Sequence, residues 1–440
     1  MHSGGSEHDD RASSGTQRPV ILAVTVAALG YFVDIFDLLL FAIVRKPSLT
    51  DLGVGIDQVK DVGIWLDNVI QTTGLVVGGI FWGILGDRRG RLSVLFGSII
   101  CYSVANVLNA FIADVAPDGP LGVLHSIGLG TALRQYEVLR FVAGFGLAGE
   151  LGAGITLVSE LLPKESRGLG TTIVASVGVL GAVAAAIVGE LLHWRTAYLV
   201  GGGLGLALLF LRVGVVESGM FRSLPTATHT TRGAFWKLLW PPARFGRYLA
   251  VILIGLPIWF AVGVLVKYAP ELGASMGIGA TELLTPGRAI MWCYIGLALG
   301  DVSSGVLSQL LRSRRAAVFI FHGITALAIA GYFVIAPRPA WVSAALLLVL
   351  GFGIGYWAVF VTIAAEQFGT NLRATAATTA PNFVRWAGAA GSALAWKYFE
   401  PSLGTWQSAA LVGGVVLVIA VVACLALRET FGVSLDFLEE

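Results

Sequence analysis

Charged side chains are scarce in this sequence. Asp, Glu, Lys and Arg make up only 13% of the 440 residues, whereas hydrophobic residues make up 56%. A soluble protein carries roughly a quarter of its residues as charged side chains. The formal net charge is +2, so the chain has no strongly basic surface for nucleic acid. This composition excludes an ordinary soluble domain and gives no support to a nucleic-acid-binding protein.

Cysteine and the motifs of enzymes are also sparse. The three cysteines, Cys101, Cys293 and Cys424, lie inside apolar segments, where packing is their expected role. The sequence has no nucleotide-binding loop, no metal-spaced cluster of His and Cys, and no nucleophile motif. We therefore expect no enzymatic activity, no bound metal and no cofactor.

Long apolar segments of roughly 20 residues recur along the chain, and each could cross about 30 Å of hydrocarbon as a helix. They lack the alternating polarity of a transmembrane barrel. The sequence predicts an all-α membrane protein embedded in the lipid bilayer. Its twelve transmembrane helices are expected at residues 18–44, 63–86, 92–113, 135–158, 167–190, 195–216, 248–268, 288–311, 315–336, 340–365, 374–397 and 406–427.

The longest polar interruption between these segments, 217–247, divides the spans six and six. It predicts a first half at 18–216 and a second half at 248–428, joined by a central cytoplasmic loop at 217–247. The ends, 1–17 and 429–440, are expected to be cytoplasmic tails, the first of them disordered. About 17 of the 29 basic residues fall on the side of the N-terminus, which predicts a cell-membrane protein with both termini inside.

A basic turn follows the second span and has a fainter copy after the eighth. The first runs Gly83-Ile-Leu-Gly-Asp87-Arg88-Arg89-Gly90-Arg91, and the copy runs from Gly305 to Arg315. Such an internal repeat is expected of duplicated halves. The first turn resembles the signature loop of the major facilitator superfamily. In that family the loop acts as a latch between the halves. Gln309 stands where the family usually has Asp, so the resemblance does not imply a second latch.

Three further segments resemble the metabolite:proton symporters of that superfamily. They are Asp34-Ile-Phe-Asp37 in the first span, the run from Arg140 to Glu150 in the fourth, and the loop from Glu160 to Arg167. The resemblance implies uptake of a small organic anion or zwitterion with a proton, by alternating access in a functional monomer. It also implies a conformational latch made of Gly83, Asp87, Arg88, Gly90, Arg91, Glu150, Glu160 and Arg167.

Asp34 and Asp37 are the candidate proton-coupling residues. They are three residues apart, so they share one face of the first helix. Two carboxylates in a medium of low dielectric constant do not both ionise easily, and one should hold a proton. Pairing of one aspartate with a basic residue, as a purely structural contact, is the alternative.

Arginines within the spans are the candidate partners of an anionic substrate. Arg385 near the middle of span 11, with Asn382 one turn earlier, suits a planar carboxylate; a salt bridge to the aspartates of helix 1 is the alternative. The full set of predicted substrate residues is Arg140, Arg385, Asn382, Tyr31, Trp259, Tyr356 and Trp357. Asp67 is expected near the interface, and Lys267 and Lys397 are expected to extend towards it.

Several functions remain open from the sequence alone. A proton antiporter could export a drug or siderophore-like metabolite with the same aspartates. A metal-cation carrier could use Asp34 and Asp37 as oxygen ligands. A transporter-like sensor could bind ligand without moving it. The sequence alone does not identify the substrate, because side chains from several helices together form the binding site.

Overall fold

The structure is a computed structural model that describes residues 7–89, 91–149, 167–217, 235–432 and 439. Every regular element in these ranges is a helix. In the first half they are α1 (Glu7–Asp51), α2 (Val59–Gly63), η1 (Ile64–Gln71), α3 (Thr72–Arg89), α4 (Arg91–Asn109), α5 (Gly122–Ser126), α6 (Ala132–Leu147), α8 (Arg167–Leu191) and α9 (Trp194–Glu217).

The second half is also helical throughout its described length. Its elements are η2 (Phe235–Leu238), α10 (Pro242–Ile254), α11 (Leu256–Phe260), η3 (Ala261–Val266), α12 (Ala269–Ser275), η4 (Ala280–Glu282), α13 (Pro286–Leu310), α14 (Arg314–Val334), α15 (Ala340–Ile354), α16 (Trp357–Glu366), α17 (Thr370–Arg385), η5 (Trp386–Gly391), α18 (Ser392–Leu403) and α19 (Thr405–Ala426).

The predicted spans coincide with these helices or with runs of consecutive helices. Eight described helices are long and apolar enough to cross a membrane, and a ninth span is α10 with α11–η3, which bend by 41°. The other three predicted spans correspond to α4, which is short, to α6, which ends close to an undescribed segment, and to α17–α18. The last of these carries the polar side chains of Asn382 and Arg385.

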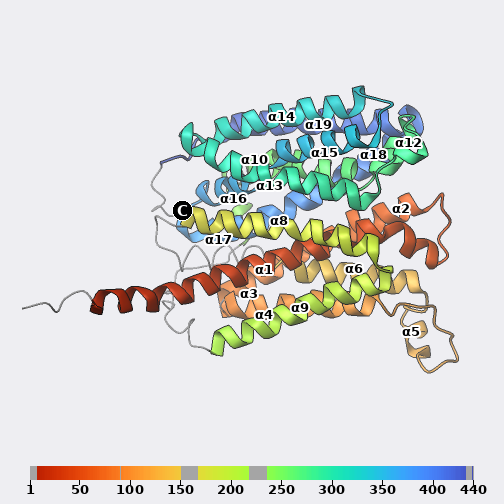
Figure 1. The fold of residues 1–440 in the computed structure, drawn as a ribbon, viewed down its shortest axis with the longest axis horizontal. Helices are drawn as coiled ribbons and strands as arrows, with labels where there is room; N and C mark the ends of the chain where they lie inside the picture. The colour runs from red at the N-terminus through yellow and green to blue at the C-terminus, as the bar shows by residue number, and fades with distance from the viewer. Residues whose placement is uncertain (1–6, 90, 150–166, 218–234, 433–438, 440) are drawn as a thin grey trace, which may run out of the picture.

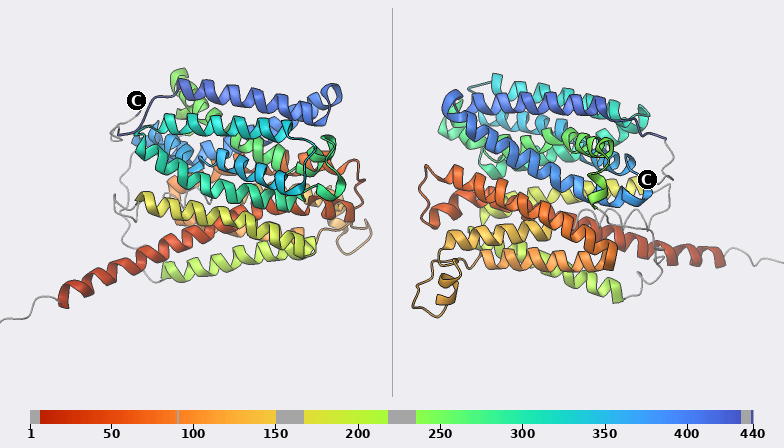
Figure 2. Two further views of the ribbon diagram at one scale, coloured as in Figure 1. Left: turned by 45° about the horizontal axis from the view of Figure 1, so that its top comes forward. Right: turned by 180° about the vertical axis from the view of Figure 1, so that it is seen from behind.

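The helices lie side by side in two groups that follow the order of the chain. Helices α1 to α9 form one group and α10 to α19 the other (Figures 1 and 2). Across the boundary α8 packs on α13 and α3 packs on α17. Functional side chains from both halves can therefore meet along this boundary.

The N-terminal helix is longer than the sequence predicts. Helix α1 begins at Glu7, so a helix replaces most of the disordered tail expected at 1–17, and it projects from the bundle in Figure 1. Adding residues to an existing helix is much easier than starting a new one, and the apolar segment of α1 supplies that start. The second half also begins earlier than expected, because α10 starts at Pro242, where a proline suits the first helical turn.

Three spans contain a π-helical segment, namely η1, η3 and η5. A π segment interrupts the regular hydrogen bonding of an α-helix and often marks a functional position. The side chain of Asn68 in η1 donates hydrogen bonds to the carbonyl oxygens of Gly263 in η3 (2.9 Å) and Ala389 in η5 (3.1 Å). One amide thus joins the irregular segments of both halves.

Candidate functional site

The guanidinium of Arg385 lies between two tryptophan rings in the interior of the second half. Its central carbon is 5.2 Å from the ring centroid of Trp259 and 5.4 Å from that of Trp357. The two indoles pack edge to face with centroids 5.9 Å apart. All three side chains are buried. Cation–π contact with both rings holds the arginine in place without neutralising its charge.

Two features of the surrounding helix position Arg385: a hydrogen bond to Asn382 and the close packing of α11 against Gly388. Nη1 donates to Oδ1 of Asn382, one turn earlier, at 3.3 Å. Asn382 also donates to the carbonyl oxygen of Ala148 in the first half at 3.3 Å. Gly388 lets α11 approach, since a Cβ there would lie 2.5 Å from that of Trp259. The residues predicted at 382 and 385 are therefore brought together with Trp259 and Trp357.

Several hydrogen-bond donors in this group are buried without an acceptor among the described residues. They are Nε of Arg385 and the indole nitrogens of Trp259 and Trp357. Arg385 also makes no ion pair with a described carboxylate, so the predicted alternative of a salt bridge to helix 1 is not seen there. Burying donors without partners costs free energy, which is typical of groups reserved for a ligand. We call Arg385, Trp259, Trp357, Asn382 and Tyr31 the central site.

Tyr31 brings the first half to the central site. Its ring packs on Gly178 of α8, where a Cβ would lie 1.9 Å from Cδ1. The electrostatic neighbours of its hydroxyl are Arg385, Asp301 and Asp34, and Trp357 lies beside it. Asp34 and Asp301 are both buried. A basic group and two acidic groups thus surround one phenol at the boundary between the halves.

Asp301 and Tyr356 have structural partners. Oδ1 of Asp301 accepts from the backbone N–H of Ala358 at 3.0 Å, at the start of α16, where a carboxylate is favourable. The hydroxyl of Tyr356 donates to the carbonyl oxygen of Ile254 at 2.9 Å, and His322 Nε2 lies 3.1 Å from it. Tyr356, expected among the substrate residues, is thereby held at the break between α10 and α11.

Asp37 lies within the first half. Its carboxylate packs on Gly201 of α9, where a Cβ would come 2.3 Å from Oδ1, and Asn106 of α4 is beside it. The side chain is only 1% exposed, and neither oxygen has a hydrogen-bond partner among the described residues. A carboxylate in such a place is costly unless it is protonated or paired. Asp34 and Asp37 thus have different surroundings although they lie on one helix.

Arg140, an electrostatic neighbour of Asp37, belongs to a buried ion pair that the sequence analysis did not identify. Nη2 of Arg140 lies 3.3 Å from Oδ1 of Asp67 and also donates to Gln71. Oδ2 of Asp67 in turn lies 2.6 Å from Nζ of Lys267 in the second half. Asp67 and Lys267 are therefore not interfacial residues as expected, because each compensates the other's charge in the interior. The polar type of both residues inside apolar spans was the available signal.

Ion pairs join the two halves at one end of the bundle, the end of α2 and α12 in Figure 1. They are Arg45–Glu271, Lys60–Glu400 (2.5 Å), Asp61–Lys397 (2.9 Å), Asp67–Lys267 (2.6 Å) and Glu190–Arg288 (3.7 Å). We call these five pairs the inter-half lock. Lys397 thus pairs with Asp61 rather than only extending to an interface. All inter-half ion pairs between described residues belong to it.

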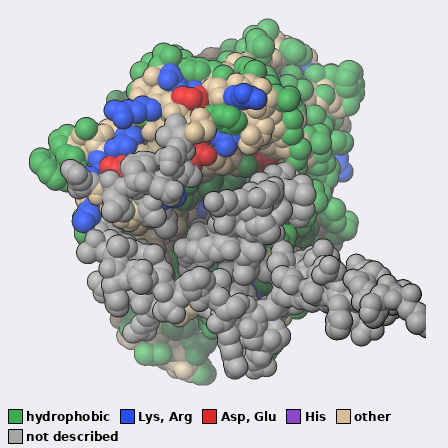
Figure 3. Space-filling model, turned by 90° about the vertical axis from the view of Figure 1, so that its left-hand side faces the viewer, with side chains coloured by type: hydrophobic (Ala, Val, Ile, Leu, Met, Phe, Trp, Pro, Cys, Tyr) green, Lys and Arg blue, Asp and Glu red, His purple; other side chains and the backbone are tan. Residues whose placement is uncertain are grey.

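The opposite end of the bundle differs. Figure 3 looks onto it and shows Lys and Arg side chains gathered among a few acidic ones. Between described residues at this end, Arg244 and Arg247 pair with Glu439, and Arg314 pairs with Glu366, all within the second half. Burial of the Glu429 carboxyl opposes its ionisation, but hydrogen bonds from Ser313 and from backbone N–H groups at the start of α14 outweigh this and lower its pKa.

The predicted latch lies almost entirely outside what the structure describes. Gly90, Glu150 and Glu160 fall in undescribed segments, and the side chains of Asp87, Arg88, Arg91 and Arg167 are likewise not described. Gly83 is described, and a Cβ there would meet no described atom within 4 Å. No close helix contact is therefore seen at Gly83 among the described residues.

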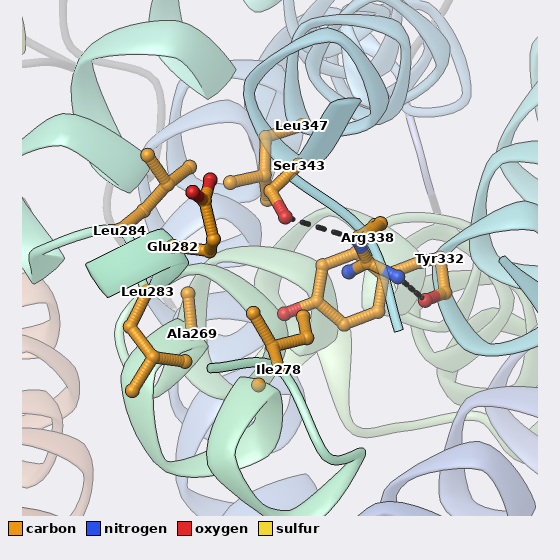
Figure 4. Close-up of a pocket in the computed structure, with 10 residues that line it drawn as sticks. Ala269, Ile278, Glu282, Leu283, Leu284, Tyr332, Arg338, Ser343 and Leu347 are labelled. Atoms are coloured by element: carbon orange, nitrogen blue, oxygen red, sulfur yellow. Dashed lines mark hydrogen bonds between the residues drawn. The ribbon is translucent and has the colours of Figure 1, made fainter. Parts of the chain in front are cut away.

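A small hollow lies apart from the central site. It is lined by residues of α12, η4, α14 and α15, and Figure 4 shows Arg338 bonded there to Ser343 and to the carbonyl oxygen of Tyr332. Burial lowers the pKa of Arg338. The space is about 10 Å³, which suits a single water molecule at most. The hollow is therefore structural.

Comparisons with known proteins give one consistent family. The family model described as Major Facilitator Superfamily matches residues 27–392. The chain is 25% identical to a putative niacin/nicotinamide transporter of Bacillus subtilis, over 86% of this chain and 89% of the relative. It is 27% identical to a probable 4-methylmuconolactone transporter of Cupriavidus pinatubonensis, over 93% and 91%. A proton:xylose symporter structure superimposes with a TM-score of 0.68 at 16% identity, covering 96% of this chain and 98% of that one.

Proposed function

The chain belongs to the Major Facilitator Superfamily and is a multi-pass membrane transporter rather than an enzyme, and we propose that it takes up a small unsaturated or aromatic carboxylate together with a proton. The two halves, 18–216 and 248–428, alternate in opening the central site to the two sides of the cell membrane. Both termini and the central loop are cytoplasmic, and the inter-half lock closes the external side.

The observation that carries this proposal is the unpaired Arg385 between Trp259 and Trp357. A guanidinium offers two parallel N–H groups to a carboxylate, and its Nε is among the donors without a partner in the described chain. The flanking indoles provide flat apolar faces and two further N–H donors for a ring and its substituents. Such a site matches a flat ring that bears a carboxylate.

The names of the relatives support the same class of substrate. Niacin is a pyridine carboxylic acid, and the second relative is named for an unsaturated lactone. Arg385 makes no ion pair with a described carboxylate, so its guanidinium is available to pair with an anionic substrate. The cytoplasmic latch of Asp87, Arg88 and Arg91 then biases the conformational equilibrium without touching substrate.

We assign proton coupling to Asp37. Asp34 lies between Asp37 and Tyr31, the central-site residue of the same helix, in the sequence. A carrier that binds an anion and a proton together moves no net charge with the loaded pair, which lowers the cost of crossing. No group of three or more His, Cys, Asp or Glu that could hold a metal ion occurs among the residues the structure describes, and the metal-carrier alternative draws no support from it.

A thermal-shift comparison of ligands on the purified protein tests the substrate class. Niacin, benzoate and other ring carboxylates should stabilise the protein, by about 2.7 kcal/mol at a hundred times Kd. Nicotinamide and xylose, which lack the carboxylate, should stabilise it much less. Equal stabilisation by neutral and anionic compounds would contradict the assignment of Arg385.

A further inference from the structure

Asp301 of α13 is a buried carboxylate that uses only one of its two oxygens. The side chain is 2% exposed. Oδ1 accepts from the backbone N–H of Ala358 at 3.0 Å, and the backbone N–H of Trp357 lies beside the same carboxylate. Oδ2 is buried and accepts no hydrogen bond from any described residue. Because a buried acceptor without a donor costs free energy, this oxygen is a candidate contact for a ligand.

The backbone around Asp301 holds this carboxyl in place. A Cβ at Gly355 would lie 2.6 Å from Cα of Gly300 and 2.8 Å from the backbone nitrogen of Asp301, so α13 directly contacts the break between α15 and α16. The carboxyl lies at the N-terminus of α16, where the helix dipole favours the ionised form. Oδ2 is therefore a hydrogen-bond acceptor rather than a donor.

The face of α13 that carries Asp301 borders the central site. Tyr294 lies two helical turns before Asp301, which places both residues on one face of the helix. The electrostatic neighbours of Tyr294 include Tyr31 and Arg385, and those of Tyr31 include Arg385 and Asp301. Trp357 connects the two charged groups, because its indole lies beside Arg385 while its backbone N–H lies beside Asp301. The central site thus has an acidic side as well as a basic one.

The polar groups nearby do not supply the missing donor in this arrangement. The hydroxyl of Tyr31 is an electrostatic neighbour of Asp301, but Oδ2 accepts no hydrogen bond from it. Arg385 bonds to Asn382 and makes no ion pair with a described carboxylate. A cationic donor and an anionic acceptor thus border one site without meeting. A ligand that lies between them can bond to both.

We propose that Asp301 is a specificity-determining residue that selects ring carboxylates bearing a hydroxyl or amino group on the ring. Arg385 receives the carboxylate, and Oδ2 of Asp301 accepts a hydrogen bond from the ring substituent. A ring without this donor leaves Oδ2 unpaired, and a site built around a buried polar group rejects such analogues strongly. The inference rests on the proposed function, since it narrows the class of ring carboxylates without defining that class.

Equilibrium binding of matched ring carboxylates tests the inference. The probes are benzoate, meta- and para-hydroxybenzoate, and the two corresponding methoxybenzoates, which keep the oxygen but lose the donor. Isothermal titration calorimetry on the purified protein measures each affinity at one pH. At least one hydroxy compound should bind the unaltered protein about ten- to a hundredfold more tightly than benzoate and than its own methoxy counterpart, as expected for a hydrogen bond to a charged group.

Two variants assign this preference to Asp301. Asp301→Asn keeps an oxygen for the N–H of Ala358 but places an amide donor where Oδ2 was, so hydroxy and methoxy compounds should bind about equally. Ser304→Ala is the control. The Ser304 hydroxyl is buried one turn later on α13 and donates to the carbonyl oxygen of Asp301, and its loss should leave the preference unchanged. Melting profiles establish that both variants are folded.

The outcomes separate this inference from the proposed function. If hydroxy and methoxy compounds bind the unaltered protein equally well, the inference is wrong and the ring-carboxylate class stands; this comparison needs no variant. A folded Asp301→Asn that keeps the full preference would show that another residue receives the donor, and would also overturn the inference. If no ring carboxylate binds the unaltered protein, the proposed function fails and the inference fails with it.

Discussion

Nζ of Lys267 lies 2.6 Å from Oδ2 of Asp67, a buried contact that joins two residues 200 positions apart in opposite halves of the chain. Around it, Asn68 bonds to the backbone of η3 and η5, and four further ion pairs connect the halves at the same end. Buried ion pairs contribute little net stability but are costly to break on one side. Such contacts are suited to select between two arrangements of the halves.

Mutating the two partners of the buried pair Asp67–Lys267 should destabilise the closed arrangement by different amounts. Asp67→Asn leaves the two buried cations Arg140 and Lys267 without their shared anion, whereas Lys267→Met leaves Asp67 still paired with Arg140. We expect Asp67→Asn to destabilise the closed arrangement by about 3–5 kcal/mol and Lys267→Met by less. Melting temperature and the distance between spin labels placed on either side of the lock measure both effects. A greater loss in Lys267→Met would show that Asp67 is not the common partner.

Two glycines of α9 offer a matched test of the space around Asp37. A Cβ at Gly201 would lie 2.3 Å from Oδ1 of Asp37, whereas at Gly203 it would meet nothing within 4 Å. Gly201→Ala should displace the carboxyl and reduce proton-driven accumulation of substrate, because overpacking in a tight core forces side chains to shift. Gly203→Ala should transport normally. Equal activity of the two variants in proteoliposomes would remove the evidence that packing around Asp37 matters.

The central site makes a prediction about substrate charge. Arg385→Ala should weaken binding of the best ring carboxylate by about 2–5 kcal/mol, because a desolvated anion loses its partner. Arg385→Lys should restore little of this, since an ammonium lacks the planar fork of donors. Trp259→Phe and Trp357→Phe keep an aromatic face but lose an N–H donor, and we expect smaller losses. Isothermal titration calorimetry measures each, and unchanged affinity in Arg385→Ala would make the arginine a structural residue.

Orientation is tested by labelling from outside the cell. A single cysteine introduced at Gly119, in the loop before α5, should react with a membrane-impermeant maleimide in intact cells. One introduced at Ser223, in the central loop, should react only after the membrane is opened. The expectation follows from the excess of basic residues on the side of the N-terminus. External labelling at Ser223 would reverse the assigned sides and place the inter-half lock in the cytoplasm.

The family and the helical fold were predictable from the sequence because they depend on local features. Apolar length is set residue by residue, and the turn after the second span resembles a specific family signature. Arg385, Asn382, Trp259 and Trp357 were predicted as candidate substrate residues together with Arg140, Tyr31 and Tyr356, but their mutual contacts were not predicted. The N-terminal helix from Glu7 was missed because the composition of 7–17 resembles that of a disordered tail.

The lock could not be predicted, for a physical reason. Asp67 and Lys267 belong to different halves, and although a charged residue inside an apolar span indicates that some partner exists, it does not indicate which residue of the other half that partner is. Their pairing depends on how η1 and η3 meet, and π-helical segments leave no clear signature in composition. The pairing of Arg140 with Asp67 could not be predicted either. Glu137 is closer to Arg140 in the sequence than Asp67 is, but it pairs with Arg134 at 2.8 Å.

The most direct measurement of the central claim is accumulation of a labelled ring carboxylate in proteoliposomes under an imposed pH gradient. Acidifying the outside should drive uptake into liposomes that contain the unaltered protein, with a proton gradient of one unit supplying about 1.4 kcal/mol, or roughly tenfold accumulation. Asp37→Asn should lose accumulation while retaining exchange of labelled for unlabelled substrate, because exchange need not release a proton. Uptake by the unaltered protein that ignores the pH gradient, or efflux driven by it, would contradict proton symport.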